Sequence, residues 1–206
     1  MSDISDARFE SALRHREAPA DLVVAIREIA DRGMIDLRGL ASDPKFMIAA
    51  KQALGLDLPK APRTSIASGD VQALWLSIDQ WLVLCPREKS GEIFANLRKG
   101  LEGTHSLAVD VSDMRAIIRL EGDGARALLL KGSSLDLMSS DYQAGTVKRL
   151  RFAEIAALLH IVSEKPDAID LYVFRSYADH AWDWLLATGR AKAAVRPFGR
   201  QPAPVV

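Results

Sequence analysis

Ile35-Asp36-Leu37-Arg38-Gly39 opens a pattern that this chain uses twice. A helix-like stretch follows the glycine, and Gly55-Leu56-Asp57-Leu58 closes the pattern. The second copy begins at Ile118-Arg119-Leu120-Glu121-Gly122 and closes at Gly132-Ser133-Ser134-Leu135-Asp136-Leu137. Each copy reads as a strand, a glycine, a helix, a second glycine and a Leu-Asp-Leu triplet. A cassette used twice predicts a pseudo-duplicated α+β fold built of strand–helix–strand units.

Local signals place further elements around the two cassettes. Ser42-Asp43-Pro44 predicts a helix start, because a capping side chain precedes a proline at the first helical position, and Gly55 predicts its end. Residues 22–29 are apolar and β-branched and predict a strand, whereas Pro59 to Gly69 is expected to be a connector. The remaining expectations are strands at 34–38, 74–78, 81–85, 107–111, 116–120, 147–152, 155–162 and 169–174, and helices near 93–101, 124–131 and 177–188.

The organisation along the chain follows from these elements. Residues 1–20 are polar and are expected to form a weakly ordered lead-in. Residues 21–189 are expected to form a single pseudo-duplicated α+β domain, with halves at about 21–103 and 104–189. Residues 190–206 contain four basic residues, three prolines and no acid, which predicts a flexible basic tail.

Composition restricts the classes of function. The 206 residues contain 27 Lys and Arg against 27 Asp and Glu, so we expect neither nucleic acid nor a membrane as partner. No apolar run approaches the length of a transmembrane helix, and Met1 to Asp6 lack the order of a signal peptide. A single cysteine agrees with a reducing compartment. These features predict a cytoplasmic protein.

Cysteine and histidine give little sign of catalysis. Cys85 ends an apolar run without a basic neighbour, so we expect a buried and unreactive thiol. The four histidines are scattered along the chain and lack metal-type spacing, and we expect them on the surface. The sequence therefore predicts no metal ligands, and no residue is assigned as catalytic or cofactor-binding.

Two polar motifs allow a chemical reading beside a structural one. Asp110-Val111-Ser112-Asp113 could place two carboxylates beside a hydroxyl, but Asp and Ser also satisfy backbone groups in turns. Gly122-Asp123-Gly124-Ala125 precedes a predicted helix but matches neither the Rossmann nor the Walker spacing of phosphate-binding loops. An N-cap is therefore favoured over a phosphate loop. Turn chemistry is the preferred interpretation of both motifs.

The predicted last helix, residues 177–188, is broader in its apolar surface than one sheet requires. Its apolar residues cover about half of the helical wheel, against a stripe of roughly 100° for a helix on a single sheet. We therefore expect the flank bearing Trp184, with the segment from Arg190 to Phe198, to contact a partner protein.

Four segments resemble the gamma subunit of heterotetrameric sarcosine oxidase. They are Gly33 to Gly39, Leu74 to Leu82, Asp110 to Asp113 and Phe174 to Leu185. The second resembles Leu-Trp-Leu-Gly-Pro-Asp-Glu-Trp-Leu, with Ser77-Ile78 and Gln80 at positions where that pattern has Gly-Pro and Glu. The resemblance covers roughly residues 20–190.

A broader similarity is to the aminomethyltransferase, or glycine-cleavage T-protein, and its folate-binding module. It rests on Asp110-x-Ser112 and on Gly122-x-x-Ala125-x-x-Leu128-Leu129. The resemblance implies the fold of that module without an assured folate site. That family's substrate-binding carboxylates match no positions here, so none is carried over.

The resemblance to the gamma subunit implies a non-catalytic subunit, inactive alone, of a sarcosine oxidase complex. Such a complex oxidatively demethylates sarcosine to glycine and passes the one-carbon unit to tetrahydrofolate. The implied partners are alpha, beta and delta subunits, and FAD, FMN, NAD and tetrahydrofolate would lie on them.

Two alternatives remain open at this point. One is a free-standing folate-dependent aminomethyltransferase, for which Asp110 or Asp113 would be the nearest candidate acids. The other is a ligand-sensing module of duplicated α+β type, which explains the repeat but leaves the wide apolar surface of the last helix unused.

Overall fold

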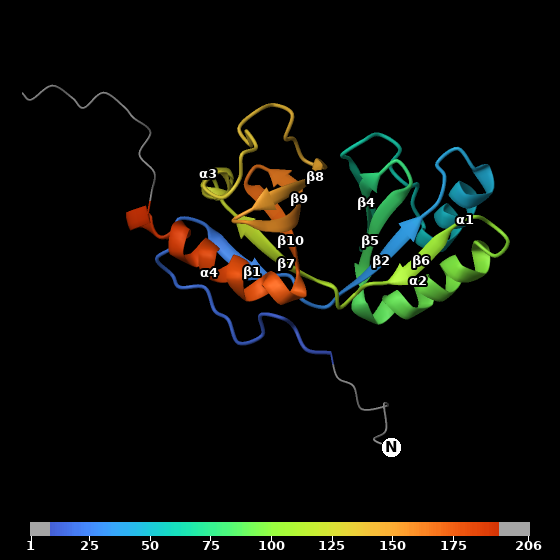
Figure 1. Ribbon diagram of the computed structural model, residues 1–206, viewed down its shortest axis with the longest axis horizontal. Coiled ribbons are helices and arrows are strands. Elements are labelled where there is room, and N and C mark those ends of the chain that lie inside the picture. The colour runs from blue at the N-terminus through green and yellow to red at the C-terminus, as the bar shows by residue number, and fades with distance from the viewer. Residues whose placement is uncertain (1–8, 194–206) are drawn as a thin grey trace, which may run out of the picture.

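Two five-stranded antiparallel sheets form the centre of the molecule in the computed structural model, which describes residues 9–193 (Figure 1). The strands are β1 (Ala25–Glu28), β2 (Arg32–Arg38), β3 (Ser65–Ser68), β4 (Val71–Ser77), β5 (Gln80–Pro86), β6 (Leu107–Asp110), β7 (Arg115–Glu121), β8 (Val147–Phe152), β9 (Ile155–Glu164) and β10 (Asp167–Phe174). The helices are α1 (Pro44–Leu54), α2 (Arg87–Gly100), α3 (Ala125–Leu130) and α4 (Ala178–Gly189), with short 3₁₀ turns η2 (Arg175–Tyr177) and η3 (Ala191–Ala193).

The two sheets have the same strand order. The first is β3-β4-β5-β2-β6 and the second is β8-β9-β10-β7-β1. Between their strands the chain places α1 and α2 in the first unit, and α3 and α4 at the corresponding points of the second. The predicted pseudo-duplicated α+β fold is therefore confirmed at the level of topology.

The leading strand of each repeat belongs to the other repeat's sheet. β1 precedes β2 in the chain but pairs with β7, whereas β6 precedes β7 but pairs with β2. The segments that follow these two leading strands form backbone hydrogen bonds at corresponding positions of the two units. Val111 N–H donates to Met34 O over 2.8 Å, and Ile29 N–H donates to Ile117 O over 2.9 Å. The expected boundary between the halves, at residues 103/104, therefore does not separate the two sheets, because each half contributes one strand to the sheet of the other.

Helix α1 shows how local sequence sets these boundaries. Asp43 caps the helix by accepting a 2.9 Å hydrogen bond from Lys45 N–H, and Pro44 occupies the first turn. Gly55 ends the helix at φ +70°, a left-handed conformation that costs little without a Cβ. The predicted start and end of this helix are confirmed.

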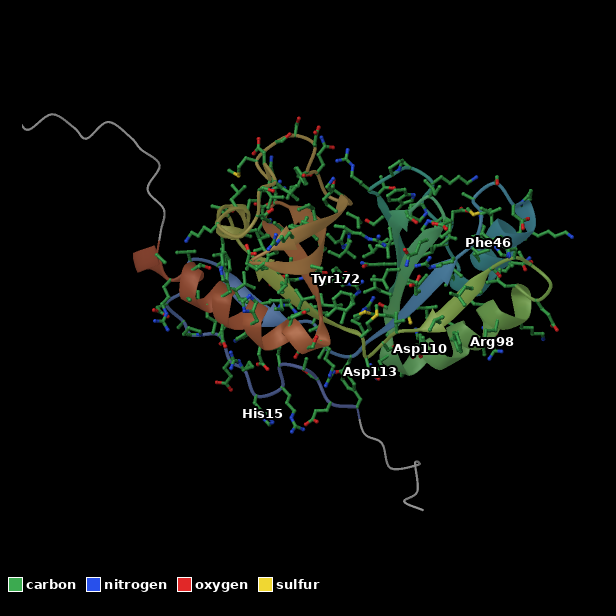
Figure 2. All side chains as sticks on the ribbon, in the orientation of Figure 1. His15, Phe46, Arg98, Asp110, Asp113 and Tyr172 are labelled. Atoms are coloured by element: carbon green, nitrogen blue, oxygen red, sulfur yellow. The ribbon has the colours of Figure 1, made fainter. Side chains whose placement is uncertain are left out.

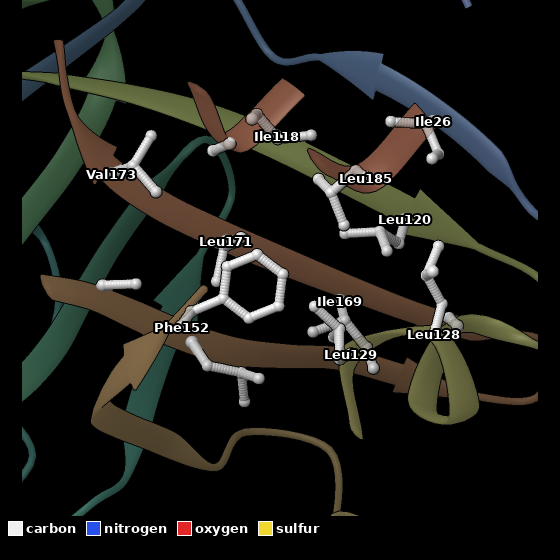
Figure 3. Packing of buried hydrophobic residues seen from close by; sticks show 14 of the residues in the cluster. Ile26, Ile118, Leu120, Leu128, Leu129, Phe152, Ile169, Leu171, Val173 and Leu185 are labelled. Carbon is white, nitrogen blue, oxygen red and sulfur yellow. The ribbon is translucent and has the colours of Figure 1, made fainter. Parts of the chain in front are cut away.

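Each sheet packs one face against its own helices. In the second unit, the side chains between sheet and helices include Leu120, Leu128, Phe152, Leu171 and Leu185 (Figure 3). In the first unit the corresponding core lies around Phe46 and Trp81, whose ring centroids are 5.6 Å apart.

The other faces of the sheets pack against each other. This third core has contributions from both units, namely Met34, Leu74, Leu76, Leu82 and Leu84 from the first sheet and Ile117, Val147, Leu158 and Tyr172 from the second. The sheets are thus inner layers and the helices outer layers, so the central strands β5 and β10 are buried along nearly their whole length (Figure 1).

Three local expectations differ from the structure. The expected connector at 59–69 contains β3, a polar edge strand with the weak pattern Ser-Ile-Ala-Ser. The expected strand at 22–29 is only Ala25–Glu28, preceded by an isolated bridge from Leu22 to Arg190. The hairpin turn falls at Ile78 and Asp79, one residue earlier than expected, because Gln80 already pairs with Arg38.

Candidate functional site

Of the residues expected at a partner interface, Trp184 lies in the middle of α4 and Arg190 directly follows the helix. Trp184 is half-buried and its indole packs edge-on against Phe152, with ring centroids 4.8 Å apart. Gly132 is also close, since a Cβ there would lie 2.8 Å from Trp184 Cη2. Part of the wide apolar surface of α4 is therefore used within the chain, which the helical wheel did not reveal.

The other two expected interface residues are Arg190 and Phe198. Arg190 is exposed and pairs through its backbone with Leu22. Lys131 Nζ secures the neighbouring backbone by donating to Thr188 O over 2.5 Å and to Ala193 O over 2.7 Å. Phe198 lies outside the described residues. The interface stays a prediction.

Cys85 is fully buried on β5, as expected. Burial raises the pKa of its thiol, and Sγ lies 3.9 Å from the carbonyl oxygen of Gly33. A thiol in this setting stays protonated and inaccessible at neutral pH.

We expect Cys85 to resist thiol reagents in the native chain and to react stoichiometrically once the chain is unfolded in denaturant. A Ser140→Cys variant provides the control, because Ser140 is exposed and a cysteine there should react at once. Equally rapid labelling of Cys85 in the native wild-type chain would show that its strand opens readily.

Asp110 and Asp113 lie where the chain passes from the first sheet to the second (Figure 2). Asp110 Oδ1 accepts from the backbone N–H of Ser112 over 2.9 Å and from its hydroxyl over 2.6 Å. The same hydroxyl accepts a 2.9 Å bond from Met34 N–H, and Asp113 accepts from Arg87 over 2.7 Å. These contacts support the turn interpretation over a catalytic carboxylate pair.

The Gly122-Asp123-Gly124 segment forms a strand-to-helix turn before α3. The predicted turn is confirmed. Gly124 occupies the N-cap position, and at this position of the described chain no side chain accepts a capping hydrogen bond. The helix has six residues, and Gly122 provides the turn at φ +116°.

A buried polar cluster between the sheets escaped the sequence analysis. Arg119 on β7 donates two hydrogen bonds to Asp170 on β10, over 2.6 and 2.8 Å. His160 on β9 pairs in register with Asp170, and its Nε2 lies 3.0 Å from Ser65 Oγ on β3. His160 is buried, so the expectation of a surface histidine is wrong at this position. The other three histidines, His15, His105 and His180, are exposed.

The cluster contains the residue types of a catalytic triad without its connections. Both oxygens of Asp170 accept from Arg119, and His160 Nδ1 is buried without a partner among the described residues. Ser65 Oγ also lies within hydrogen-bond distance of Gly145 O, at 3.0 Å, so this carbonyl competes with His160 for the single hydroxyl proton. An activated serine needs a histidine base that a carboxylate orients. The geometry instead stabilises the packing of the two sheets.

The protonation of His160 should make stability depend on pH. Burial lowers the pKa of His160 to about 4, because a charged imidazole is poorly solvated between the sheets. The neutral form contributes its full stability above the ordinary pKa of 6.5, and that contribution is lost as pH falls toward 4.

Between pH 7 and pH 5 we expect the free energy of unfolding to fall by about 2 kcal/mol through this group. Urea unfolding at the two pH values measures it. His160→Gln should remove most of the difference, whereas His105→Gln, on the surface, should retain it. An equal pH dependence in the His160→Gln chain would assign the effect to other groups.

Other site types are missing from residues 9–193. That part of the chain contains no cluster of three His, Cys, Asp or Glu side chains able to bind a metal ion. Within the same residues, every helix is too short or too polar to span a bilayer.

Comparison with known proteins identifies the family. A profile described as the sarcosine oxidase, gamma subunit family matches residues 38–191, which is most of the chain. The chain belongs to the sarcosine oxidase gamma subunit family. The resemblance carried by the four sequence segments is thereby confirmed.

Individual relatives agree with the sarcosine oxidase gamma family assignment. Sarcosine oxidase subunit gamma of Corynebacterium sp. (strain U-96) is 26% identical over 183 residues, which cover 87% of this chain and 86% of that protein. A chain of the heterotetrameric sarcosine oxidase from Corynebacterium sp. U-96 has the same fold, with a TM-score of 0.78 at 22% identity, covering 90% of this chain and 93% of that one.

The chain also resembles in fold the aminomethyltransferase of the glycine cleavage system. The aminomethyltransferase T from Bartonella henselae superposes with a TM-score of 0.61 at 15% identity, over 79% of this chain but only 45% of that enzyme. This likeness confirms the predicted fold of the aminomethyltransferase module. A free-standing aminomethyltransferase is not favoured, because the sequence matches fall on the gamma family.

Proposed function

We propose that this chain is the non-catalytic gamma subunit of a heterotetrameric sarcosine oxidase complex. The family match over residues 38–191 carries the proposal, and the shared fold across 90% of the chain supports it. The complex would oxidatively demethylate sarcosine to glycine and transfer the one-carbon unit to tetrahydrofolate. Its other members would be alpha, beta and delta subunits, in the cytoplasm, with FAD, FMN, NAD and tetrahydrofolate bound to them.

The internal use of polar side chains supports a role in assembly rather than chemistry. Asp170 is neutralised by Arg119, and Asp167 accepts bonds of 3.0 and 3.1 Å from Arg126. The same Arg126 donates to two backbone carbonyls, over 2.7 and 2.8 Å. Side chains held in such ion pairs and hydrogen bonds stabilise the second unit, and they are not available to exchange protons with a substrate.

The proposed contact with a larger subunit lies on the flank of α4. Trp184 forms one wall of a hollow of about 570 Å³, whose lining includes Lys131, Arg151, Glu154 and His180. A half-buried tryptophan beside a polar rim has the composition of an interface hot spot. Arg190 and the segment to Phe198 would extend this contact.

Trp184→Ala should weaken assembly with the partner subunits by roughly 2 kcal/mol, as for a buried aromatic hot spot. The measurement is the affinity of the purified chain for the remaining subunits produced together. Because Trp184 also packs on Phe152, the charge reversal Arg190→Glu serves as a second variant that leaves the core intact.

The matched control is Ile48→Ala, an exposed apolar residue on α1 of the other unit, and it should assemble normally. Unfolding of the isolated Trp184→Ala chain would identify Trp184 as a core residue. A folded Trp184→Ala chain with unchanged affinity would place the interface elsewhere.

The function itself is tested by reconstitution. The chain produced together with its partner subunits should co-purify with flavin-containing chains, and that assembly should produce hydrogen peroxide from sarcosine. The isolated chain should produce none. Turnover of sarcosine by the isolated chain would contradict a non-catalytic role, and failure to join a flavin-containing assembly would contradict the proposed complex.

A further inference from the structure

Three arginines converge on one cavity between the two sheets. The cavity has a volume of about 340 Å³ and opens at the end of the sheets where β2 and β4 finish and β7 begins. Arg38 is the last residue of β2, Arg115 the first of β7, and Arg149 lies in the middle of β8. Residues from both units therefore build this site, which the proposed function does not use.

The positive charge of the cavity is incompletely balanced. Asp36 is the acidic neighbour, with one oxygen 3.8 Å from Arg38 Nε. Both of its oxygens also accept from Gln80 Nε2 over 2.9 Å, and Gln80 Oε1 accepts from Arg149 over 2.9 Å. The single negative charge of Asp36 thus faces the positive charges of three guanidinium groups. Like charges gathered in this way repel one another unless an anion joins them.

Arg115 is the most exceptional of the three. Its Nε–H is buried and has no hydrogen-bond partner among the described residues. The guanidinium stacks over the ring of Phe174, 4.6 Å from the centroid, which fixes its plane at the cavity wall. Burial lowers the pKa of Arg115, and the nearby Arg149 lowers it further, so a negative charge beside it would relieve both penalties.

The duplication shows that the fold itself does not require Arg38 and Arg149, whereas the position of Arg115 is occupied by another arginine, Arg32, in the first unit. β2 corresponds to β7, so the position of Arg38 is occupied by Glu121 in the second unit. β8 corresponds to β3, and the strand registers place Ala67 at the position of Arg149. The arginine cluster is therefore a feature of one side of a pseudo-symmetric structure.

The rest of the lining is apolar. Leu76, Leu158, Ala157 and the ring of Phe174 contribute hydrophobic surface beside the guanidinium groups. Pockets of about 300–1,000 Å³ that combine apolar walls with a few fixed polar groups are typical of small-molecule sites. Guanidinium groups bind carboxylates through paired hydrogen bonds.

We propose that this cavity binds a small organic carboxylate, with the carboxylate at Arg38, Arg115 and Arg149 and the organic part against Phe174 and Leu158. A dicarboxylate of glutarate size would neutralise the two positive charges that Asp36 leaves unbalanced. The walls distinguish such a ligand from an inorganic anion, which would leave the apolar surface uncovered.

The test titrates the full-length chain with glutarate, benzoate and inorganic phosphate, following calorimetric heat and the shift of the thermal midpoint. Glutarate or benzoate should bind saturably and more tightly than phosphate. Arg149→Gln and Arg38→Gln change exposed side chains and should each weaken carboxylate binding by about tenfold or more. Arg151→Gln, two residues further along β8, is the matched control and should bind normally.

Three results would overturn the proposal. The first is the lack of saturable binding by either carboxylate at millimolar concentration. The second is unchanged binding in Arg149→Gln, and the third is phosphate binding as tight as that of the carboxylates. If neither carboxylate binds and Arg149→Gln instead weakens assembly with partner subunits, the cavity accepts an acidic side chain from a protein.

Discussion

Asp170→Leu should lower the free energy of unfolding by about 3–5 kcal/mol, because it removes one partner of a buried ion pair and leaves the other charge uncompensated. The Asp170 side chain is 5% exposed and that of Arg119 is 21% exposed, so water can solvate the remaining guanidinium only in part. Urea unfolding of the isolated chain, followed by circular dichroism, measures the loss.

Two controls separate charge burial from loss of packing. The double variant Arg119→Leu with Asp170→Leu removes both charges and should recover most of the stability, since apolar replacements of buried pairs are often neutral. Asp57→Asn breaks the exposed pair with Lys51 and should cost about 1 kcal/mol or less. A double variant no more stable than Asp170→Leu would refute the electrostatic explanation.

Trp81→Ala is the second large expected effect, also about 3–5 kcal/mol of unfolding free energy. Trp81 is fully buried, packs against Phe46 and donates a 2.8 Å hydrogen bond from Nε1 to Pro59 O. The substitution leaves a large cavity beneath α1 and a buried carbonyl without a donor.

Trp75→Ala is the natural comparison, because Trp75 and Trp81 face each other in register across the β4–β5 hairpin. Trp75 is only partly buried and packs at the margin of the same core, so its removal should cost clearly less. The sequence places both tryptophans on neighbouring strands but could not show which of the two is the buried anchor. Equal losses from both substitutions would contradict the assignment.

Elements with their own local signals could be predicted from the sequence. Asp43-Pro44 and Gly55 define α1 because the cap, the proline and the left-handed glycine act within one turn of each helix end. The strands β7, β9 and β10 have long apolar or alternating runs and were expected at nearly the observed positions. The repeat also predicted that the two halves would be related in strand arrangement, but it did not predict the strand order itself or the exchange of β1 and β6.

Features that depend on contacts distant in sequence could not be predicted in this way. β3 is a short edge strand of mostly small and polar residues that pairs with β4 on one side, so its sequence resembles a loop. His160 is surrounded by Leu159 and Ile161, yet nothing local indicates that Ser65 and Asp170 meet it between the sheets. The three arginines of the cavity likewise come from three separate strands, β2, β7 and β8.

The paired glycines that revealed the duplication have different physical roles in the two units. Gly39 is required by packing, since a Cβ there would lie 2.3 Å from Phe46 Cε2, whereas its counterpart Gly122 adopts φ +116°. Gly55 ends a helix at φ +70°, whereas Gly132 allows Phe152 and Trp184 to approach. The repeat was therefore visible in residue type although the reasons for glycine have diverged.

The exchange of β1 and β6 has a consequence for the origin of the molecule. A polypeptide with a single repeat would have a leading strand without a partner and a sheet lacking its fifth strand. Two identical copies would resolve both defects at once, each lending its first strand to the other, as in domain-swapped homodimers. The ancestor implied by this topology is such a homodimer. Tandem fusion of the gene for such a repeat would make the second partner part of the same molecule, so that mutual completion would no longer depend on protein concentration.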